Sequence, residues 1–181
     1  MEEDANDAVV DHLPAWLARQ AEVDAGPREW GVPASEQIAA LAGVDMFRAM
    51  VAGRLPAPPI CKTLDFIMVE ADFGRIVFQG RPGVAHYNPM GTVHGGWFAT
   101  LLDSAVGCAV GSALPVGKAY TTAELKINIV RPLTTKVPLV RAEGRIIYIG
   151  SRMATAEGHL TGPDGKLYAH ASTTCFIFDA P

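Results

Sequence analysis

The feature that most limits how this chain folds is the apolar segment Gly95–Ser112. Its pattern predicts a helix that is apolar on almost every side, with Asp103 as its single charged residue. A helix of this kind must be covered on nearly all of its sides. Because the segment is rich in Gly, Ala and Ser and carries a carboxylate, we expect a buried core helix rather than a membrane span.

Segments with the pattern of strands lie on both sides of this helix in the sequence. They cover Thr63–Ala71 and Arg75–Gly80 before it, and Thr121–Arg131, Val137–Ile149, Arg152–Thr161 and Lys166–Phe178 after it. Alternation in the third segment predicts that Ala123 and Leu125 share one face of the strand and that Thr122 lies on the other. We therefore predict an α+β fold in which a strongly curved antiparallel sheet wraps around one long central helix.

The first 60 residues have a different pattern from the rest of the chain. Helical patterns at His12–Val23 and Ser35–Ala52 are separated by glycine and prolines, and Ser35 is a candidate N-cap. The proline-rich segment Leu55–Pro59 then ends any helix and predicts a stiff linker. We therefore divide the chain into an N-terminal helical extension with this linker, residues 1–60, and a domain that holds the sheet and the long helix, residues 61–181.

Composition excludes several classes of function. The 15 basic and 19 acidic residues give a net charge of −4, which is no reason to expect nucleic-acid binding. The acidic start, residues 1–4, lacks the basic region of a signal peptide. Cys61, Cys108 and Cys175 form no C-x-x-C pair, which is typical of free thiols in a reducing cytosol. We expect a cytoplasmic protein that binds neither nucleic acid nor a membrane.

The start of the long helix and its carboxylate together indicate a site. Burying an unpaired carboxylate costs several kcal/mol, so Asp103 is either well satisfied or in use. Gly96 lies seven residues earlier on nearly the same face, roughly 10 Å away along the axis. At Gly95 and Gly96 the helix presents free backbone N–H groups that can hold an oxyanion. Asn88 and His94 add side-chain donors nearby, and the combination fits acyl transfer or hydrolysis.

Each part of this arrangement also has a purely structural interpretation. The Gly95-Gly96 pair can be a tight entry into the helix, and His94 can be a capping or core residue. Asn88, which precedes a proline, is a natural turn residue. Asp103 can hold a backbone amide of a neighbouring loop. The spacing of all four parts is therefore a stronger signal than any one of them.

That spacing resembles a known family. Asn88-x5-His94-Gly95-Gly96, Asp103, the run Thr121-Thr122-Ala123-Glu124-Leu125-Lys126 and Arg131-Pro132 are similar to the PaaI-type (phenylacetate-degradation-type) acyl-CoA thioesterases of the hotdog superfamily. The resemblance covers about residues 60–178. It implies hydrolysis of an acyl- or aryl-CoA thioester to free acid and CoA, with no cofactor beyond the CoA of the substrate. It also implies a homodimer that assembles into a homotetramer.

The resemblance further implies roles for residues of this chain. Asp103 would be the nucleophile or general base toward the thioester carbonyl. Asn88 would hold the water or the thioester, and Thr122 or Thr121 would assist the water. The backbone N–H groups at the Gly95-Gly96 pair would polarise the thioester oxygen.

In the same family pattern, His94 would orient the loop that carries the glycine pair. Asp103 would complete a site whose loop, residues 88–96, comes from the partner subunit. The two halves of one active site would therefore belong to two chains.

Candidates for binding the rest of the substrate are less specific. Arg131 lies at a strand end, and Ser151 and Arg152 lie at a hairpin; a guanidinium suits bidentate contact with phosphate, although a solvated turn charge is the alternative. Trp97, directly after the glycine pair, would narrow the acyl pocket, and Met90 would line it.

Two other functions compete with hydrolysis. A hotdog enoyl-CoA hydratase or dehydratase would use His94 and Asp103 together as proton shuttles, but these residues lie on opposite helix faces within one chain. A non-catalytic acyl-CoA-binding module is the second alternative. A Ser-His-Asp hydrolase is disfavoured because no G-x-S-x-G is present, and neither a zinc spacing nor a nucleotide fingerprint appears.

Overall fold

The computed structural model describes residues 11–180. The acidic start used in the signal-peptide argument lies outside the described residues. In the described part of the chain four short helices come first, followed by two strands, a 3₁₀ turn (η1, Val84–His86), one long helix and four more strands. The early helices are α1 (Leu13–Ala25), α2 (Ser35–Ile38), α3 (Gly43–Val51) and α4 (Pro59–Thr63).

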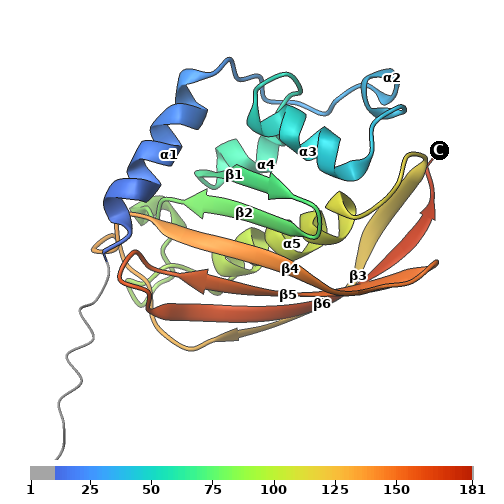
Figure 1. Cartoon of the computed structure of the whole chain (residues 1–181). Helices are drawn as coiled ribbons and strands as arrows, with labels where there is room; N and C mark the ends of the chain where they lie inside the picture. Colours follow the sequence, from blue (N-terminus) through green and yellow to red (C-terminus); the bar gives the residue numbers. More distant parts are fainter. Residues whose placement is uncertain (1–10, 181) are drawn as a thin grey trace, which may run out of the picture.

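The strands form one antiparallel sheet in the order β1-β2-β4-β5-β6-β3 (Figure 1). Their bounds are β1 Phe66–Asp72, β2 Arg75–Gly80, β3 Lys118–Ile129, β4 Val140–Ile149, β5 Met153–Thr161 and β6 Leu167–Asp179. Each predicted strand segment overlaps one of these strands. In this order β1 and β3 are the two edge strands of the sheet.

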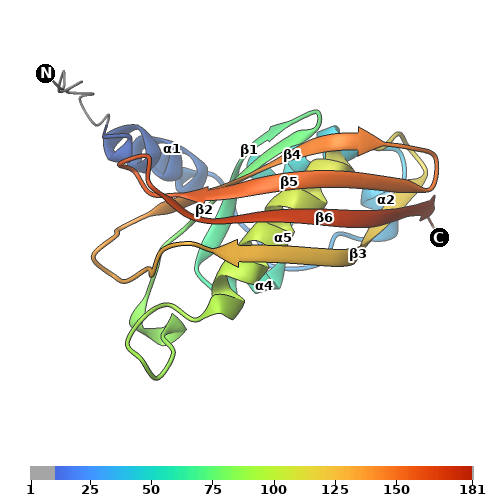
Figure 2. The ribbon, with the colours of Figure 1, turned by 90° about the horizontal axis from the view of Figure 1, so that it is seen from below.

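Helix α5 (Gly95–Ser112) lies along the concave face of this sheet, as Figure 2 shows from below. It packs against all six strands, and Leu101, Leu102, Ala105 and Val106 are fully buried. The sheet approaches it so closely that a Cβ atom at Gly144 would clash with the Ala105 carbonyl group. The predicted α+β fold, with a curved sheet wrapped around one central helix, is therefore confirmed.

Strand β3 contains a bulge that strict alternation does not predict. Its register against β6 shifts between Thr122 and Glu124, so one extra residue is accommodated there. As a result Thr122 and Leu125 both turn inward, whereas Ala123 is exposed. The predicted placement of Ala123 with Leu125 on one face is wrong, because the bulge reverses the faces on one side of it.

Helix α1 covers the face of β1 and β2 that points away from α5. Val23 packs there against Ile67, Val69 and Val77, which alternate along their strands with residues that face the central helix. Arg19 reinforces the contact by donating from Nε and Nη2 to the Val69 carbonyl oxygen at 2.9 and 2.6 Å. The sheet is thus covered on its inner face by α5 and on part of its outer face by α1.

The segment predicted as one helix, Ser35–Ala52, is two helices, because the chain leaves the helical path after α2 and re-enters it at Gly43. The N-cap of α2 is Ala34, whose N–H donates to the Gln37 side chain at 2.8 Å, so Ser35 is the first helical residue instead. Helix α3 lies at the β1 edge, and its Phe47 joins the core beside α5.

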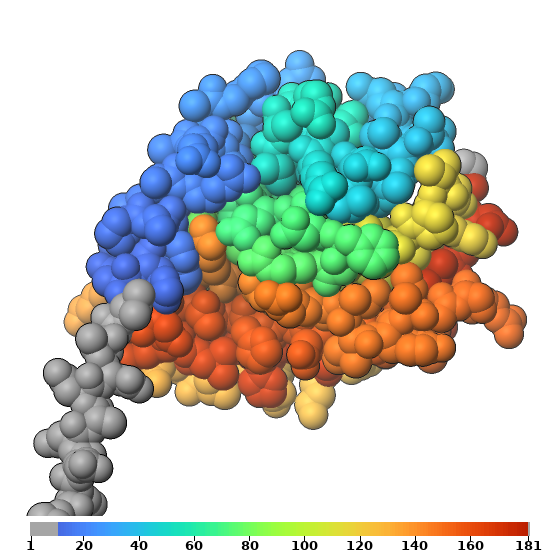
Figure 3. All heavy atoms as spheres, in the orientation of Figure 1, coloured from blue at the N-terminus to red at the C-terminus, as the bar shows by residue number. Residues whose placement is uncertain are grey.

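The proline-rich segment is tied to the rest of the extension. Ala57 accepts a hydrogen bond from Gly31 N–H at 2.9 Å and donates to the Glu29 carbonyl at 2.8 Å. The predicted boundary at residue 60 falls within α4. In Figure 3 the blue and cyan atoms of the extension lie directly against the green atoms of β1 and β2.

Candidate active site

The N-terminus of α5 is capped by His94. The imidazole Nδ1 of His94 accepts the Gly96 N–H at 2.8 Å, and the backbone N–H of His94 donates to the His86 carbonyl at 2.8 Å. A neutral imidazole that accepts at Nδ1 carries its proton on Nε2. Of the two glycine amides, the Gly96 N–H is thus engaged, and the Gly95 N–H has no hydrogen-bond partner within residues 11–180. Gly95 is the amide left to polarise a carbonyl oxygen.

Asn88 holds the loop before the helix in shape. Its Oδ1 accepts the N–H groups of Met90 and Thr92 at 3.0 and 3.3 Å, and its Nδ2 donates to the Thr92 hydroxyl at 3.0 Å. Gly91 completes the turn with a φ of 78°, where a side chain would be strained. The Asn88 side chain therefore stabilises a turn, which is the structural role that its position before a proline suggested. Met90, at the tip, is 77% exposed.

A cavity of about 340 Å³ opens beside this helix start. Its wall includes Asn88, Gly95 and Phe98 on one side and residues 129–132, with Arg131, on the other. The fold thus brings the free Gly95 amide and Arg131, which the sequence places 36 residues apart, into the wall of one cavity. A ligand in this cavity can meet a hydrogen-bond donor and a positive charge at once.

The carboxylate lies farther along the helix. Asp103 is half-buried, and its Oδ1 accepts a hydrogen bond from the Thr122 hydroxyl at 3.0 Å. The bulge in β3 makes this contact by turning Thr122 inward, whereas Thr121 is exposed on the opposite face. Of the two threonines considered from the sequence, the structure therefore places Thr122 at the carboxylate.

The two halves of the candidate site are separate within one chain. Asp103 follows Gly95 by eight residues, which is about 12 Å along a helix axis. A single thioester group is too small to touch both the Gly95 amide and the Asp103 carboxylate of the same chain. The sequence-predicted residues therefore form two groups, one at the helix start and one at its middle.

Other sequence candidates lie elsewhere. Ser151 and Arg152 are exposed at the β4–β5 hairpin, which lies near the start of β3. Arg131 follows the end of β3, so the length of that strand separates it from the hairpin by roughly 33 Å. Trp97 is 3% exposed and belongs to the core: its indole N–H donates to the Leu64 carbonyl at 2.8 Å, and its ring stacks on His86. Trp97 therefore does not face the cavity at the helix start.

Tyr120 is a residue near the carboxylate that the sequence reasoning missed. Its ring lies against Gly107 and Gly111 of α5, and its hydroxyl donates to Cys108 Sγ at 3.7 Å. The available signal was a large aromatic residue two positions before Thr122, opposite glycines spaced one helical turn apart. Burial raises the pKa of Tyr120 and raises the pKa of Cys108 to about 12, so both groups are neutral at pH 7. Cys108 is thus unsuited to act as a thiolate nucleophile.

Sequence comparison identifies the family. A family model described as "Thioesterase superfamily" matches residues 90–169. A "putative esterase" of Saccharolobus solfataricus is 32% identical over 123 residues, which cover 67% of this chain and 84% of that protein. The chain belongs to the thioesterase superfamily. A second "putative esterase", from Halobacterium salinarum, is 37% identical over 73 residues, so the match spans 40% of this chain and only about half, 48%, of that protein.

Solved thioesterase structures share the fold. A "putative thioesterase, phenylacetic acid degradation-related protein" of Ralstonia eutropha JMP134 is 28% identical, with a TM-score of 0.65 over 75% of this chain and 99% of that one. A "hypothetical thioesterase protein" of Streptococcus pneumoniae TIGR4, solved with coenzyme A, is 21% identical, with a TM-score of 0.58 over 64% and 87% of the two chains. The resemblance to PaaI-type hotdog thioesterases is confirmed.

The matched thioesterase region contains both glycines, Asp103 and Thr122, whereas Asn88 and the N-terminal extension lie outside it. Across residues 11–180, no helix is long and apolar enough to cross a membrane. The same residues contain no group of three or more His, Cys, Asp or Glu side chains arranged to hold a metal ion.

Proposed function

We propose that this member of the thioesterase superfamily hydrolyses acyl-CoA thioesters in the cytoplasm, without a cofactor of its own. The observation that carries the proposal is the half-buried Asp103 carboxylate, held by Thr122 on an otherwise apolar helix. Binding alone would be served by an apolar residue at this position. A carboxylate beside an acyl group can instead activate water or attack the carbonyl carbon.

A second copy of the chain would complete the site. Strand β3 is an edge strand, and such an edge presents unpaired N–H and C=O groups to another strand. Antiparallel pairing of two β3 strands would reverse one α5 relative to the other. The helix start of one copy, with its free Gly95 amide, would then approach the Asp103 and Thr122 of its partner copy, which removes the separation of about 12 Å.

The reaction would follow from these groups. Asp103 either removes a proton from a water molecule that attacks the thioester carbonyl carbon or attacks that carbon itself, and Thr122 positions the water. The carbonyl oxygen becomes an oxyanion that accepts the Gly95 N–H at the positive end of the helix dipole. Collapse of the tetrahedral intermediate breaks the C–S bond, and the CoA sulfur leaves and takes up a proton. When Asp103 attacks directly, water then hydrolyses the resulting anhydride.

Recognition of CoA is supported by two observations. The Streptococcus pneumoniae thioesterase of the same fold was solved with coenzyme A. In this chain Arg131 lies in the cavity wall with Asn88 and Gly95. Pairing of two β3 strands would also bring the Ser151-Arg152 hairpin of one copy to the end that carries Arg131 of the other, so one CoA could be held by arginines from both.

An exposed apolar patch on the outer face of the sheet supports a further level of assembly. Tyr148, Met153, Phe176 and Phe178 lie there with exposed fractions of 44 to 58%. Met153 and Phe176 are direct neighbours in the register of β5 and β6. Exposed apolar patches of this kind mark interaction sites. Two dimers packed through this face would form a homotetramer.

The test compares thiol release from a panel of aliphatic and aromatic acyl-CoAs by the wild type, Asp103→Asn and Asp45→Asn. Asp45 is an exposed carboxylate on α3, so it is a matched control. We expect Asp103→Asn to lower kcat about 10²- to 10⁴-fold, with Asp45→Asn unchanged. Near-normal turnover by a folded Asp103→Asn protein would overturn the mechanism. Wild-type binding of acyl-CoA without hydrolysis would favour the binding module, and hydration of enoyl-CoA would favour the hydratase.

A further inference from the structure

A second cavity, of about 490 Å³, lies where the N-terminal extension meets the C-terminal end of α5. The thioesterase domain contributes Gly111, Leu114 and the start of β3, and the extension contributes Ser35, Glu36, Ile38, Ala39, Leu41, Gly43 and Met46. Much of the lining is apolar, including Ile38, Leu41, Met46, Leu114 and Tyr120. In Figure 3 the cyan atoms of α2 and α3 lie against the yellow atoms at the end of α5 and the start of β3.

The floor of this cavity is held in a defined shape. The Gly43 N–H donates to the Leu114 carbonyl at 3.0 Å, which ties the start of α3 to the end of α5. A Cβ atom at Gly43 would clash with the Gly111 carbonyl group, so the two backbones can meet only through a glycine. The extension is therefore hydrogen-bonded to the end of the central helix and packs directly against it.

A strip along one side of α5 runs from the candidate carboxylate toward the cavity. Asp103, Gly107 and Gly111 are spaced four residues apart and lie on one side of the helix. The Tyr120 ring covers both glycines, and the Thr122 hydroxyl lies beside Gly107. From Asp103 to Gly111 the strip is about 12 Å long. The glycines let the Tyr120 ring pack directly on the helix, so the ring fills this strip, and Tyr120 also lines the cavity at its far end.

The charges near the cavity are unsuited to holding a charged ligand inside it. Lys118 is an exposed residue whose ammonium group pairs with Asp179 at 2.6 Å, and Glu36 is exposed on α2. Both belong to the rim, whereas Leu41, Met46 and Leu114 are partly or fully buried. An aliphatic chain that enters from the Asp103 end matches this lining, since it gains by leaving water and needs no polar partner.

We propose that this cavity holds the tail of the acyl group, so that the N-terminal extension determines the longest acyl chain accepted. The proposal rests on the thioesterase function proposed above. The thioester would lie at Asp103 and Thr122, and its alkyl tail would displace the Tyr120 ring from Gly107 and extend into the space beneath α2. The substrate class is then straight-chain aliphatic acyl-CoA, long enough to reach the extension.

The test changes the cavity from the extension side, away from the proposed catalytic groups. Leu41→Trp fills the cavity, Leu41→Ala enlarges it, and Leu17→Trp places the same bulk on α1, where Leu17 is 48% exposed. The kcat/KM for hydrolysis is measured for each protein with straight-chain substrates from acetyl-CoA to palmitoyl-CoA. Thermal melting confirms that each variant is folded.

We expect Leu41→Trp to lower kcat/KM about tenfold or more for the longest chains that the wild type accepts, with acetyl-CoA little affected. Leu41→Ala should shift the preference to longer chains, and Leu17→Trp should change nothing. Identical chain-length profiles for the wild type and both folded Leu41 variants would overturn the proposal while leaving thioesterase activity intact. Should Leu41→Trp fail to fold, Leu41→Ala alone decides, because an unchanged profile contradicts the proposal.

Failure of the proposed function is distinguishable from failure of this inference. If the wild type hydrolyses no acyl-CoA, calorimetric binding of S-alkyl-CoA thioethers of increasing chain length replaces turnover as the readout. Affinity that rises with chain length in the wild type, and is lost for long chains in Leu41→Trp, supports the tail cavity. Affinity that is independent of chain length, or equal in the two proteins, overturns it.

Discussion

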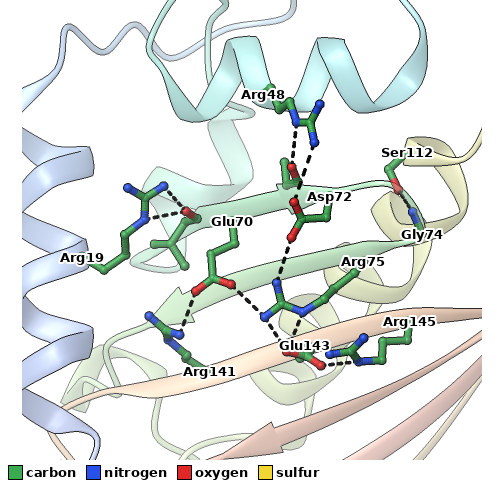
Figure 4. Close-up of polar contacts among 12 residues, drawn as sticks. Arg19, Arg48, Glu70, Asp72, Gly74, Arg75, Ser112, Arg141, Glu143 and Arg145 are labelled. Atoms are coloured by element: carbon green, nitrogen blue, oxygen red, sulfur yellow. Dashed lines mark hydrogen bonds and ion pairs between the residues drawn. The ribbon is translucent and has the colours of Figure 1, made fainter.

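Carboxylates in two regions of this molecule have opposite surroundings. On the outer face of the sheet, Glu70 accepts from Arg75 at 2.7 Å and from Arg141 at 2.9 Å (Figure 4). Glu143 accepts from Arg75 at 2.8 Å and also pairs with Arg145. Burial opposes ionisation of Glu143, but the hydrogen bonds from Arg75 and Arg145 outweigh it, so its pKa is lowered. Each of these carboxylates is matched by guanidinium groups.

Asp103, on the inner helix, has no such partner. Within residues 11–180, its carboxylate is held by the Thr122 hydroxyl and forms no ion pair. A hydroxyl orients a carboxylate without neutralising it, and this leaves capacity for a proton or a substrate. The difference supports the proposal that Asp103 serves the reaction, whereas the outer network stabilises the fold.

The largest effect expected concerns the division of the site between two copies. Asp103→Asn and Asn88→Ala should each inactivate the enzyme alone, because the first removes the carboxylate from both sites of a homodimer and the second removes the side chain that shapes the loop before the helix start in both sites. Unfolding and refolding the two variants together should restore roughly a quarter of wild-type activity, since half of the dimers then contain one intact site. The measurement is thiol release before and after mixing.

A mixture that stays as inactive as its components would contradict a shared site. The control mixes Asp103→Asn with itself after the same refolding. An inactive mixture of the two variants would place both halves of the reaction within one chain, in conflict with the separation along α5.

The second prediction concerns the outer network. Arg75→Met removes one partner from both Glu70 and Glu143 and should lower the free energy of unfolding by about 2 kcal/mol, with kcat unchanged. Because the pKa of Glu143 is depressed in the folded state, its contribution to stability is present above its ordinary pKa of 4.5 and is lost as the pH falls through the lowered value. Urea denaturation at pH 7 and at acid pH measures both effects.

In Arg75→Met this loss on acidification should be smaller than in the wild type. Normal stability with reduced turnover in Arg75→Met would contradict the prediction, since it would assign the outer charges to catalysis and not to stability. Lys166→Met, at an exposed pair with Asp164, is the control and should change stability little.

The smallest effect expected is at the hydroxyl that orients Asp103. Thr122→Val should lower kcat roughly tenfold, and Thr122→Ser, which keeps the hydroxyl, should restore most of it. Stability should differ little between the two variants, because the side chain is only half-buried. Equal activity of the Val and Ser variants would show that the contact with Asp103 is structural. Steady-state kinetics together with thermal melting separate the two cases.

Much of the fold could be predicted because it depends on local patterns. The predicted helix Gly95–Ser112 and the strand Arg75–Gly80 agree with the structure at both ends. Both are strongly apolar segments bounded by glycines or turns, so the limits are marked in the sequence itself. Helix α2 was harder to predict, since its break before Gly43 depends on the contact of Gly43 with the end of α5.

The site could be predicted in part, and the reasons differ by residue. Asp103 could be proposed from the sequence because a single charge within an apolar helix is visible without the structure. Trp97 was assigned to the acyl pocket from its position after the glycines, but its indole N–H finds a partner at Leu64, which no spacing indicates. Tyr120 was missed because its role depends on glycines of another element.

By itself, therefore, the sequence determined an apolar helix with one carboxylate, a sheet able to cover it and a glycine pair at its start. These follow from hydrophobicity and backbone propensity, which act over a few neighbouring residues. Only the tertiary structure decided that a bulge turns Thr122 toward Asp103, that His94 occupies the Gly96 amide and that the extension closes a cavity at the end of α5. Those outcomes depend on packing between segments far apart in the chain, where a shift of one residue reverses which side chain faces inward.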